Sequence, residues 1–395
     1  MSPAFGPSVE LHRALERWRT RLWLAGAVLL AASVAGAFFG PDDFFHAYLV
    51  GFLLCLGLVL GSMGFLMMQY LTAGAWGIVT RRVFEAASRT LPLVALFFIP
   101  VAFGMRVLYE WARPDRVRAN ALLQHRGLYL NPVMFVVRAV IYFAVWITVA
   151  WFLNRWSADE DTAPSNQPHK LARLSAPGLI IYVFTITFAA VDWVESLQTR
   201  WYSTMWGFLF VAGEGLAAIA FAIVVLWLLR RVQPMASVLR ASHFHDLGKL
   251  LLMMVMIWAY FTFSQLLIVW AGDLPKEISY YLPRWMTSWG WVGGLLFLAQ
   301  FLIPFLLLLS APLKRNAVLL SAVAILVLVM RYVDLVWMVV PGYHNEGFHI
   351  TWLTITAPLG LLCVWTWAFL RELPKRALLP FNTPELEEAL VHETE

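Results

Sequence analysis

Apolar runs of about the length that crosses a bilayer follow one another along the chain. A transmembrane helix needs about 20 mainly apolar residues, because each residue advances a helix by about 1.5 Å. The polar stretches between the runs are too short to bury a core of their own. The pattern predicts an all-α polytopic membrane protein with ten spans, at residues 21–39, 43–68, 89–110, 131–153, 176–197, 202–229, 247–270, 285–309, 316–340 and 350–370.

Composition agrees with this pattern. Of the 395 residues, 61% are hydrophobic and 13% are charged, with a mean hydropathy of +0.71; a soluble domain has about 25% charged residues. The net charge of +5 does not indicate a nucleic-acid partner, because the basic residues lie in short loops where they set orientation. Cys55 and Cys363 lie within apolar runs, so there is no disulfide framework, haem-attachment motif or cysteine metal site.

The distribution of basic residues predicts the orientation. Of the 29 lysines and arginines, 19 lie on the side of the chain ends, 7 lie on the other side, and Arg106, Arg138 and Arg331 lie within spans. Both termini are therefore expected in the cytoplasm. Residues 8–20 resemble an amphipathic interfacial helix. They favour a retained first span over a signal peptide, although Ala35-Gly36-Ala37 resembles a cleavage site.

A faint internal repeat suggests how the spans are grouped. The pattern of Gly51-Phe52-Leu53 and Gly57 recurs 156 residues later as Gly207-Phe208-Leu209 and Gly213. Four spans separate the copies, so both would run in the same direction. The predicted units are an interfacial helix with the first span at 1–42, a four-helix bundle at 43–200, a second four-helix bundle at 201–345, and the tenth span with a cytoplasmic tail at 346–395.

Charged residues inside the spans are the main candidates for function. Counted at about 1.5 Å per residue, five of them fall about 8–14 Å below the outer face: Arg106, Arg138, Asp192, Arg331 and Asp334. They are either ion pairs that lock the bundles together or the lining of a hydrated proton half-channel. In either case Asp192 and Asp334 are expected to pair with Arg106, Arg138 or Arg331.

Glu214 lies deeper, about 18 Å below the outer face, between two glycines. It has no evident partner on its own helix, and burial favours its neutral form, so it is a candidate proton-loading site. The alternative is a permanently protonated acid that bonds across a helix pair. On the inner side the candidates are Glu85, Asp246 and Lys249, with Gln300 nearby.

The histidines argue against haem in the membrane. All nine lie in loops or at span ends, whereas a membrane b-type haem needs axial ligands within the spans. His46, His344 and His349 are near the predicted outer face. We interpret each as a hydrated interfacial histidine in preference to a ligand or proton carrier.

Several motifs follow one another in a recognisable order along the chain. These are Trp76-Gly77 with Arg81-Arg82-Val83-Phe84-Glu85-Ala86, Tyr129-Leu130-Asn131 with Arg138, Asp192-Trp193 through Trp201-Tyr202-Ser203-Thr204, Asp246-Leu247-Gly248-Lys249-Leu250, Trp258-Ala259-Tyr260 with Phe263-Ser264-Gln265, Ile303-Pro304-Phe305, Lys314-Arg315-Asn316, Arg331 with Asp334-Leu335-Val336-Trp337, and Thr383-Pro384-Glu385-Leu386. Together they resemble one protein family, the F subunit of alternative complex III, a bacterial quinol:electron-acceptor oxidoreductase in the wider NrfD-like group.

The resemblance implies two four-helix bundles with flanking helices, in a complex of the bacterial inner membrane. It implies that this chain binds no cofactor, while partner subunits carry iron–sulfur clusters and c-type haems. The expected partners are the paralogous C subunit, where the quinol site is better supported, an outer iron–sulfur subunit, c-type cytochrome subunits, menaquinol or ubiquinol, and lipid. The chain would be a scaffold near quinone, with a proton half-channel as its candidate contribution.

Two other interpretations remain open. The chain resembles the paralogous C subunit as well, and parallel repeats with a charge at the membrane midplane also suit a secondary transporter. Within the family interpretation, the basic outer loop 113–126 is expected to dock the outer iron–sulfur subunit, because its four arginines lie on the side that should have few.

Overall fold

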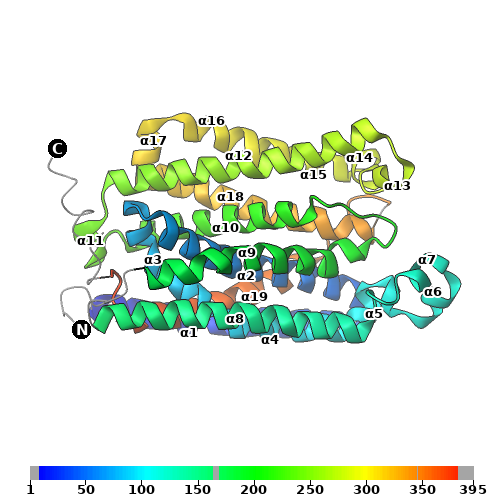
Figure 1. Cartoon of the computed structure of the whole chain (residues 1–395), viewed down its shortest axis with the longest axis horizontal. Coiled ribbons are helices and arrows are strands. Elements are labelled where there is room, and N and C mark those ends of the chain that lie inside the picture. Colours follow the sequence, from blue (N-terminus) through cyan, green and yellow to red (C-terminus); the bar gives the residue numbers. More distant parts are fainter. Residues whose placement is uncertain (1–8, 163–168, 345, 381–395) are drawn as a thin grey trace.

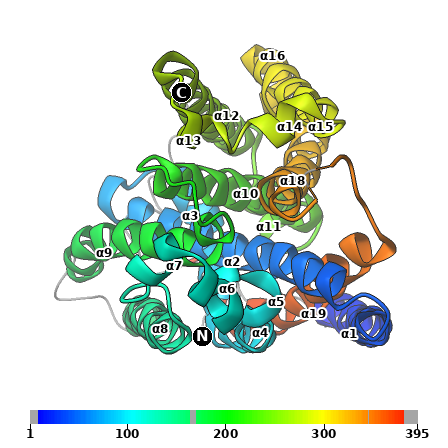
Figure 2. The same ribbon diagram turned by 90° about the vertical axis from the view of Figure 1, so that its right-hand side faces the viewer.

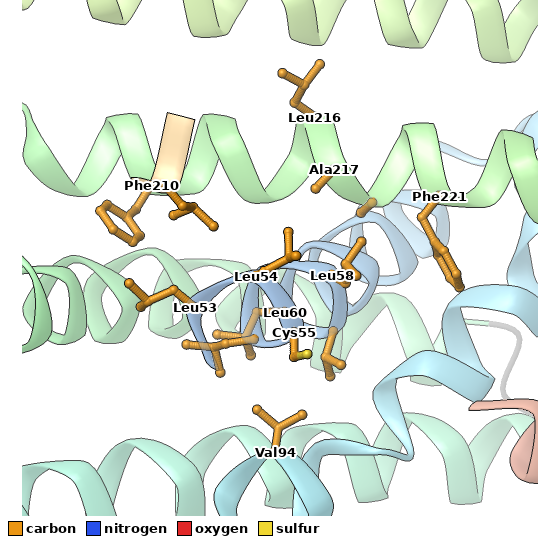
Figure 3. Packing of buried hydrophobic residues seen from close by; sticks show 14 of the residues in the cluster. Leu53, Leu54, Cys55, Leu58, Leu60, Val94, Phe210, Leu216, Ala217 and Phe221 are labelled. Carbon is orange, nitrogen blue, oxygen red and sulfur yellow. The ribbon is translucent and has the colours of Figure 1, made fainter. Parts of the chain in front are cut away.

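Two helices, α2 (Pro41–Thr72) and α10 (Trp206–Leu229), lie at the centre of the molecule and are buried along most of their length. The computed structural model describes residues 9–162, 169–344 and 346–380, and every regular element among them is helical. Both central helices are apolar on all sides, as a helix enclosed by other helices must be. Figure 3 shows Leu54 of α2 directed toward α10, with Val94 approaching α2 from the opposite side.

The all-α polytopic class is confirmed. Within the described residues, nine helical stretches are long and apolar enough to cross a membrane, and a bent pair makes a tenth if it is counted as one span. They run side by side along the long axis of the molecule (Figure 1). Besides α2 and α10 they are α1 (Val9–Ala37), α8 (Pro132–Thr162), α9 (Lys170–Trp193), α12 (Ala241–Gly272), α15 (Trp289–Leu296) with the π-helical turn η3 (Phe297–Leu302) and α16 (Ile303–Leu309), α18 (Ala317–Val339) and α19 (Trp352–Glu372).

The third predicted span, 89–110, differs from the structure. Within this range α4 (Leu91–Phe103) ends before residue 110, and it forms a pair with the preceding helix α3 (Ala75–Ser88), bent by 42°. Pro92 lies in the first turn of α4, where its missing N–H costs no helical hydrogen bond, so a new helix begins there. The prediction omitted α3 because this helix contains two arginines and a glutamate.

A second difference concerns the N-terminal segment. Residues 8–20 do not form a separate interfacial helix: their described part continues directly into the first span as α1. The physical reason is that no glycine or proline occurs between Leu11 and Ala25, so nothing in this stretch ends the helix. Residue 8, the tail beyond residue 380 and the tail motif that begins at Thr383 lie outside the described residues.

Short helices form the two ends of the molecule. We call them the α6/α7 end, at the right of Figure 1, and the α11/α17 end, at the left. The short elements are α5 (Met105–Leu108), η1 (Glu110–Ala112), α6 (Pro114–Ala119), α7 (Ala121–His125), η2 (Glu195–Leu197), α11 (Met235–Val238), α13 (Pro275–Ile278), α14 (Leu282–Met286), α17 (Ala311–Arg315), η4 (Val340–Gly342) and η5 (Leu373–Lys375).

Helix contacts gather around the two central helices. Helices α4 and α9 pack against α2, and α8 packs against both α4 and α9. Helices α12 and α18 pack against α10, and α15 and α16 complete that side, while α1 and α19 pack on each other and on α2. Viewed from the α6/α7 end, α12 and α16 lie at one edge and α8, α4 and α1 at the other (Figure 2). The residue limits of the two bundles stay predictions.

Candidate functional site

Asp192, near the end of α9, is fully buried and forms a bidentate ion pair with Arg138 of α8. The arginine Nε and Nη2 atoms each donate to one carboxylate oxygen at 2.8 Å. The Tyr142 hydroxyl donates to the carboxylate at 2.9 Å. The Arg138 guanidinium also lies 3.8 Å from the ring centre of Tyr129, whose pKa is raised by burial and by the charge of Asp192. The predicted pairing of Asp192 with Arg138 is confirmed.

Asp334 of α18 is buried beside Arg331, one helical turn earlier, and this predicted pair is also confirmed. The arginine Nη1 donates to Oδ2 at 2.5 Å. The indole N–H of Trp258, from α12, donates to the same oxygen at 3.2 Å. Gln300 of η3 is fully buried; with its amide oriented to satisfy both ends, it donates to the Met330 carbonyl at 2.9 Å and accepts from Trp258 at 3.3 Å. Helices α18 and α12 therefore meet at this carboxylate, and Gln300 from a third span bonds to Trp258 beside it.

Glu214 is buried where α10 crosses α2 and α9. Its Oε2 accepts a hydrogen bond of 2.5 Å from the Tyr182 hydroxyl of α9. On the other side of this turn, Gly213 makes room for Arg331, since a Cβ built there would lie 2.3 Å from the guanidinium carbon. Glu214, Arg331 and Asp334 thus belong to one buried polar cluster, formed mainly by α10 and α18.

Four of the five outer charges form two ion pairs, Asp192–Arg138 and Asp334–Arg331. Tyr182, which bonds to Glu214, lies ten residues before Asp192 on α9, about 15 Å along the helix, so the Asp192–Arg138 pair is separate from Glu214, in keeping with the greater depth predicted for that acid. Arg106 belongs to neither group: it is exposed on α5, and no ion pair of its side chain occurs among the described residues. Its carbonyl accepts from the Nε of Arg113 at 2.5 Å. The prediction misplaced Arg106 because α4 ends earlier than the apolar run.

The inner candidates differ strongly in their surroundings. Glu85 of α3 is fully buried and lies within 4.0 Å of four arginine side chains, namely Arg81, Arg82, Arg89 and Arg376. Asp246 and Lys249 form an exposed pair at 3.0 Å on α12; such pairs contribute about 0–1 kcal/mol. In the described part of the chain no hydrogen bond joins either group to Glu214, and their role in proton transfer stays a prediction.

A cavity of about 520 Å³ opens between α12 and α15 and reaches Asp334. Its walls are aromatic and aliphatic, and several wall side chains, including Tyr260, Phe263 and Phe297, are exposed on the outer surface of the helix bundle. Trp258 and Trp337 lie at its inner side. The cavity therefore combines an apolar entrance with one buried carboxylate, an arrangement that suits an amphipathic molecule dissolved in the membrane.

Several buried charged residues were missed from the sequence, among them Arg284 and Glu195. Arg284 of α14 counted only as an orientation signal, yet it is fully buried and donates to the carbonyls of Tyr280, Trp337 and Met338 at 2.7–3.2 Å. It caps the last turn of α18, and burial lowers its pKa. Glu195 is buried and accepts from the backbone of Ser203. The sequence gives no signal for these contacts, because the partners are backbone carbonyl and amide groups and not side chains.

Comparison of the sequence with protein-family models finds no match, and comparison with curated proteins finds none either.

Proposed function

We propose that this chain is an integral membrane subunit of a respiratory quinol oxidoreductase complex, similar to the F subunit of alternative complex III, with its redox centres in partner subunits. The observation that carries the proposal is the convergence of the motif residues. Trp258 belongs to one motif of the resemblance, and Asp334 and Trp337 belong to another, yet all three line the same membrane-facing cavity. Residues far apart in the sequence would be expected to meet in this way if the motifs describe one site.

The chemistry of the cavity supports a quinol as the molecule that enters it. A quinol has a flat aromatic head with hydroxyl groups and an apolar tail, and aromatic walls offer stacking partners for the ring. The Asp334 carboxylate can accept a hydrogen bond from a hydroxyl, and Trp258 already holds one of its oxygens from the other side. The tail would leave between α12 and α15 toward lipid. The chain then acts as a quinone-proximal scaffold.

The polar cluster around Glu214 supports a proton-conducting contribution. Asp334, at the cavity, pairs with Arg331, and the Arg331 guanidinium packs against Gly213, the residue before Glu214. A proton released in the cavity would thus meet a buried titratable acid one helix away. In this proposal the α11/α17 end faces the bacterial cytoplasm, following the excess of basic residues on that side.

Affinity purification from native membranes tests complex membership. A tagged chain in mild detergent is expected to bring down a c-type haem, seen in its reduced-minus-oxidised spectrum, and iron–sulfur subunits, identified by mass spectrometry. A chain that purifies without either, and that moves a solute when it is reconstituted alone, would be a transporter. If haem copurifies, crosslinking distinguishes the F subunit from the C paralogue. Direct crosslinks from the outer loops of this chain to the nearest iron–sulfur subunit would indicate that it occupies the position of the C paralogue.

A cavity-filling substitution tests quinol binding. Gly294 lines the cavity and has no atom within 4 Å of a built Cβ, so the Cβ of Gly294→Phe meets no clash and its ring is expected to occupy cavity space. Gly272 is equally open but lies outside the cavity, so Gly272→Phe is the matched control. Labelling by a photoreactive quinone is expected in α12 and α15 of the wild type and the control, and to be lost in Gly294→Phe. Equal labelling of all three proteins would place the quinol elsewhere.

A further inference from the structure

Two histidines that the sequence places in a loop meet an aspartate of another helix at the α6/α7 end. Asp43 lies in the first turn of α2, and His344 and His349 lie between η4 and α19. One carboxylate oxygen of Asp43 is 3.4 Å from Nε2 of His344 and 3.3 Å from Nε2 of His349. The ligand-capable atoms of the three side chains all lie within 4.8 Å of one another.

These distances fit a shared metal ion better than hydrogen bonds. N–H···O bonds are most often 2.7–3.2 Å long, so both contacts are long for hydrogen bonds. Zinc binds nitrogen at about 2.0–2.1 Å and carboxylate oxygen at about 2.0–2.2 Å, and two ligands at tetrahedral angles are then about 3.4 Å apart. The two observed separations match that edge length.

Ring contacts hold the two histidines next to each other. The imidazoles of His344 and His349 are stacked, with ring centres 4.0 Å apart and an angle of 28° between the planes. Both rings bring Nε2 to the same carboxylate oxygen of Asp43. His46 lies behind them: it is buried, stacks on Tyr343 at 3.4 Å and meets His344 edge-on. The packing of His46 and Tyr343 thereby helps to hold the His344 ring in place.

We propose that Asp43, His344 and His349 bind a divalent transition-metal ion, with Zn²⁺ as the best fit to two imidazoles and one carboxylate. The side chains are partly exposed, between 25% and 45%, so the fourth position is open to water or to a group from outside the chain. The ion joins the start of α2 to the segment that links α18 with α19. It thus ties together two parts of the chain that are far apart in the sequence.

Equilibrium dialysis of the purified full chain against Zn²⁺, with an affinity tag that contains no histidine, tests the site. The wild type, stripped with a chelator, is expected to take up one tightly bound Zn²⁺ per chain. Because loss of even an outer-shell partner weakens metal sites about 10–100-fold, removal of a ligand in His349→Ala or Asp43→Asn should weaken binding about 100-fold or more. The matched control is His125→Ala, an exposed histidine of α7 at the same end.

Two further readouts separate loss of the site from loss of the fold. Co²⁺, used as the spectroscopic probe, is expected to give the intense visible absorption of a tetrahedral ion in the wild type and in His125→Ala only. With chelator present, all variants should unfold at the same temperature, and Zn²⁺ should raise it only for the wild type and the control. The proposal is overturned if the wild type takes up no tightly bound Zn²⁺, or if His349→Ala and Asp43→Asn bind it as the wild type does.

Discussion

At the scale of single residues, the buried acids differ in what holds them. Asp192 has a bidentate arginine and a tyrosine hydroxyl, whereas Glu214 has one tyrosine hydroxyl and an arginine that packs against the neighbouring glycine. Charges within apolar runs can be recognised from the sequence, and so can i,i+3 pairs such as Arg331 with Asp334. Partners on other helices, such as Tyr182 for Glu214, depend on helix packing and cannot be deduced from one sequence.

The Arg331–Asp334 pair gives the first prediction. Removing one member of a buried ion pair strands the other and costs about 3–5 kcal/mol, so Arg331→Leu should lower the yield and thermal stability of the protein far more than Arg331→Lys. Lys249→Leu breaks the exposed pair with Asp246 and is the control, expected to cost at most about 1 kcal/mol. Thermal unfolding in detergent measures all three. Wild-type stability in both Arg331 variants would contradict a structural role for the pair.

Glu214 gives a prediction about protons. Glu214→Gln keeps the size and a hydrogen bond with Tyr182 but cannot titrate, so electron transfer in the reconstituted complex should continue while fewer protons move per electron. Tyr182→Phe removes the hydrogen bond and leaves the acid, and it should retain most of the proton movement. The number of protons moved per electron is measured from pH changes during quinol oxidation in vesicles. If Glu214→Gln moves as many protons per electron as the wild type, the residue has a role in packing only.

At the scale of elements, α3 shows where hydropathy misleads. The charged residues of α3 suggest a loop in water, because a hydropathy scale treats each side chain as if it faced lipid. In the structure they neutralise one another: Glu85 is enclosed by arginines of α3 and of the segment after η5, and Arg81 bonds to Glu160 at 2.7 Å. The pairing lets a charged helix pack inside the protein, and α3 and α4 then form a bent pair in place of one straight span.

The crossing of α2 and α10 gives a prediction about packing. A Cβ built on Gly61 would lie 2.2 Å from the carbonyl oxygen of Glu214, whereas one built on Gly57 would lie 3.4 Å from its side chain. Gly61→Ala must therefore separate two backbones, which should cost about 1–3 kcal/mol, and Gly57→Ala should be nearly neutral. Denaturation of both variants in the same detergent measures the difference. Equal stability would mean that the helices do not approach so closely.

At the scale of the whole molecule, the apolar pattern predicts the crossings and leaves the shape of the surfaces unspecified. The number of spans follows from run lengths, since each run must match the bilayer. The cavity at Asp334 depends on how α12 and α15 diverge, and the Asp43–His344–His349 cluster joins segments from opposite parts of the chain. Each histidine, taken alone in the sequence, looked like an ordinary interfacial residue, because only folding brings the three ligands together.

The α6/α7 end gives the last prediction. Of the four arginines in loop 113–126, Arg113 and Arg126 donate to backbone carbonyls of their own chain, which leaves Arg116 and Arg118 exposed on α6. A polar hollow of about 580 Å³ beside Arg116 offers space for a partner. If an acidic face of the outer iron–sulfur subunit docks here, as the proposed function requires, reversing both charges places like charges together.

We therefore expect the double substitution Arg116→Glu and Arg118→Glu to weaken retention of that subunit roughly 10-fold or more, and increasingly at low salt, where charges are screened least. Lys276→Glu, an exposed charge reversal of the same sign on α13, is the control for position, since it adds negative charge away from α6. Retention is measured by mass spectrometry after washing the immobilised complex at graded salt concentrations. Because the substituted side chains face solvent, folding should be unaffected, and undiminished retention would show that the docking surface lies elsewhere on this end.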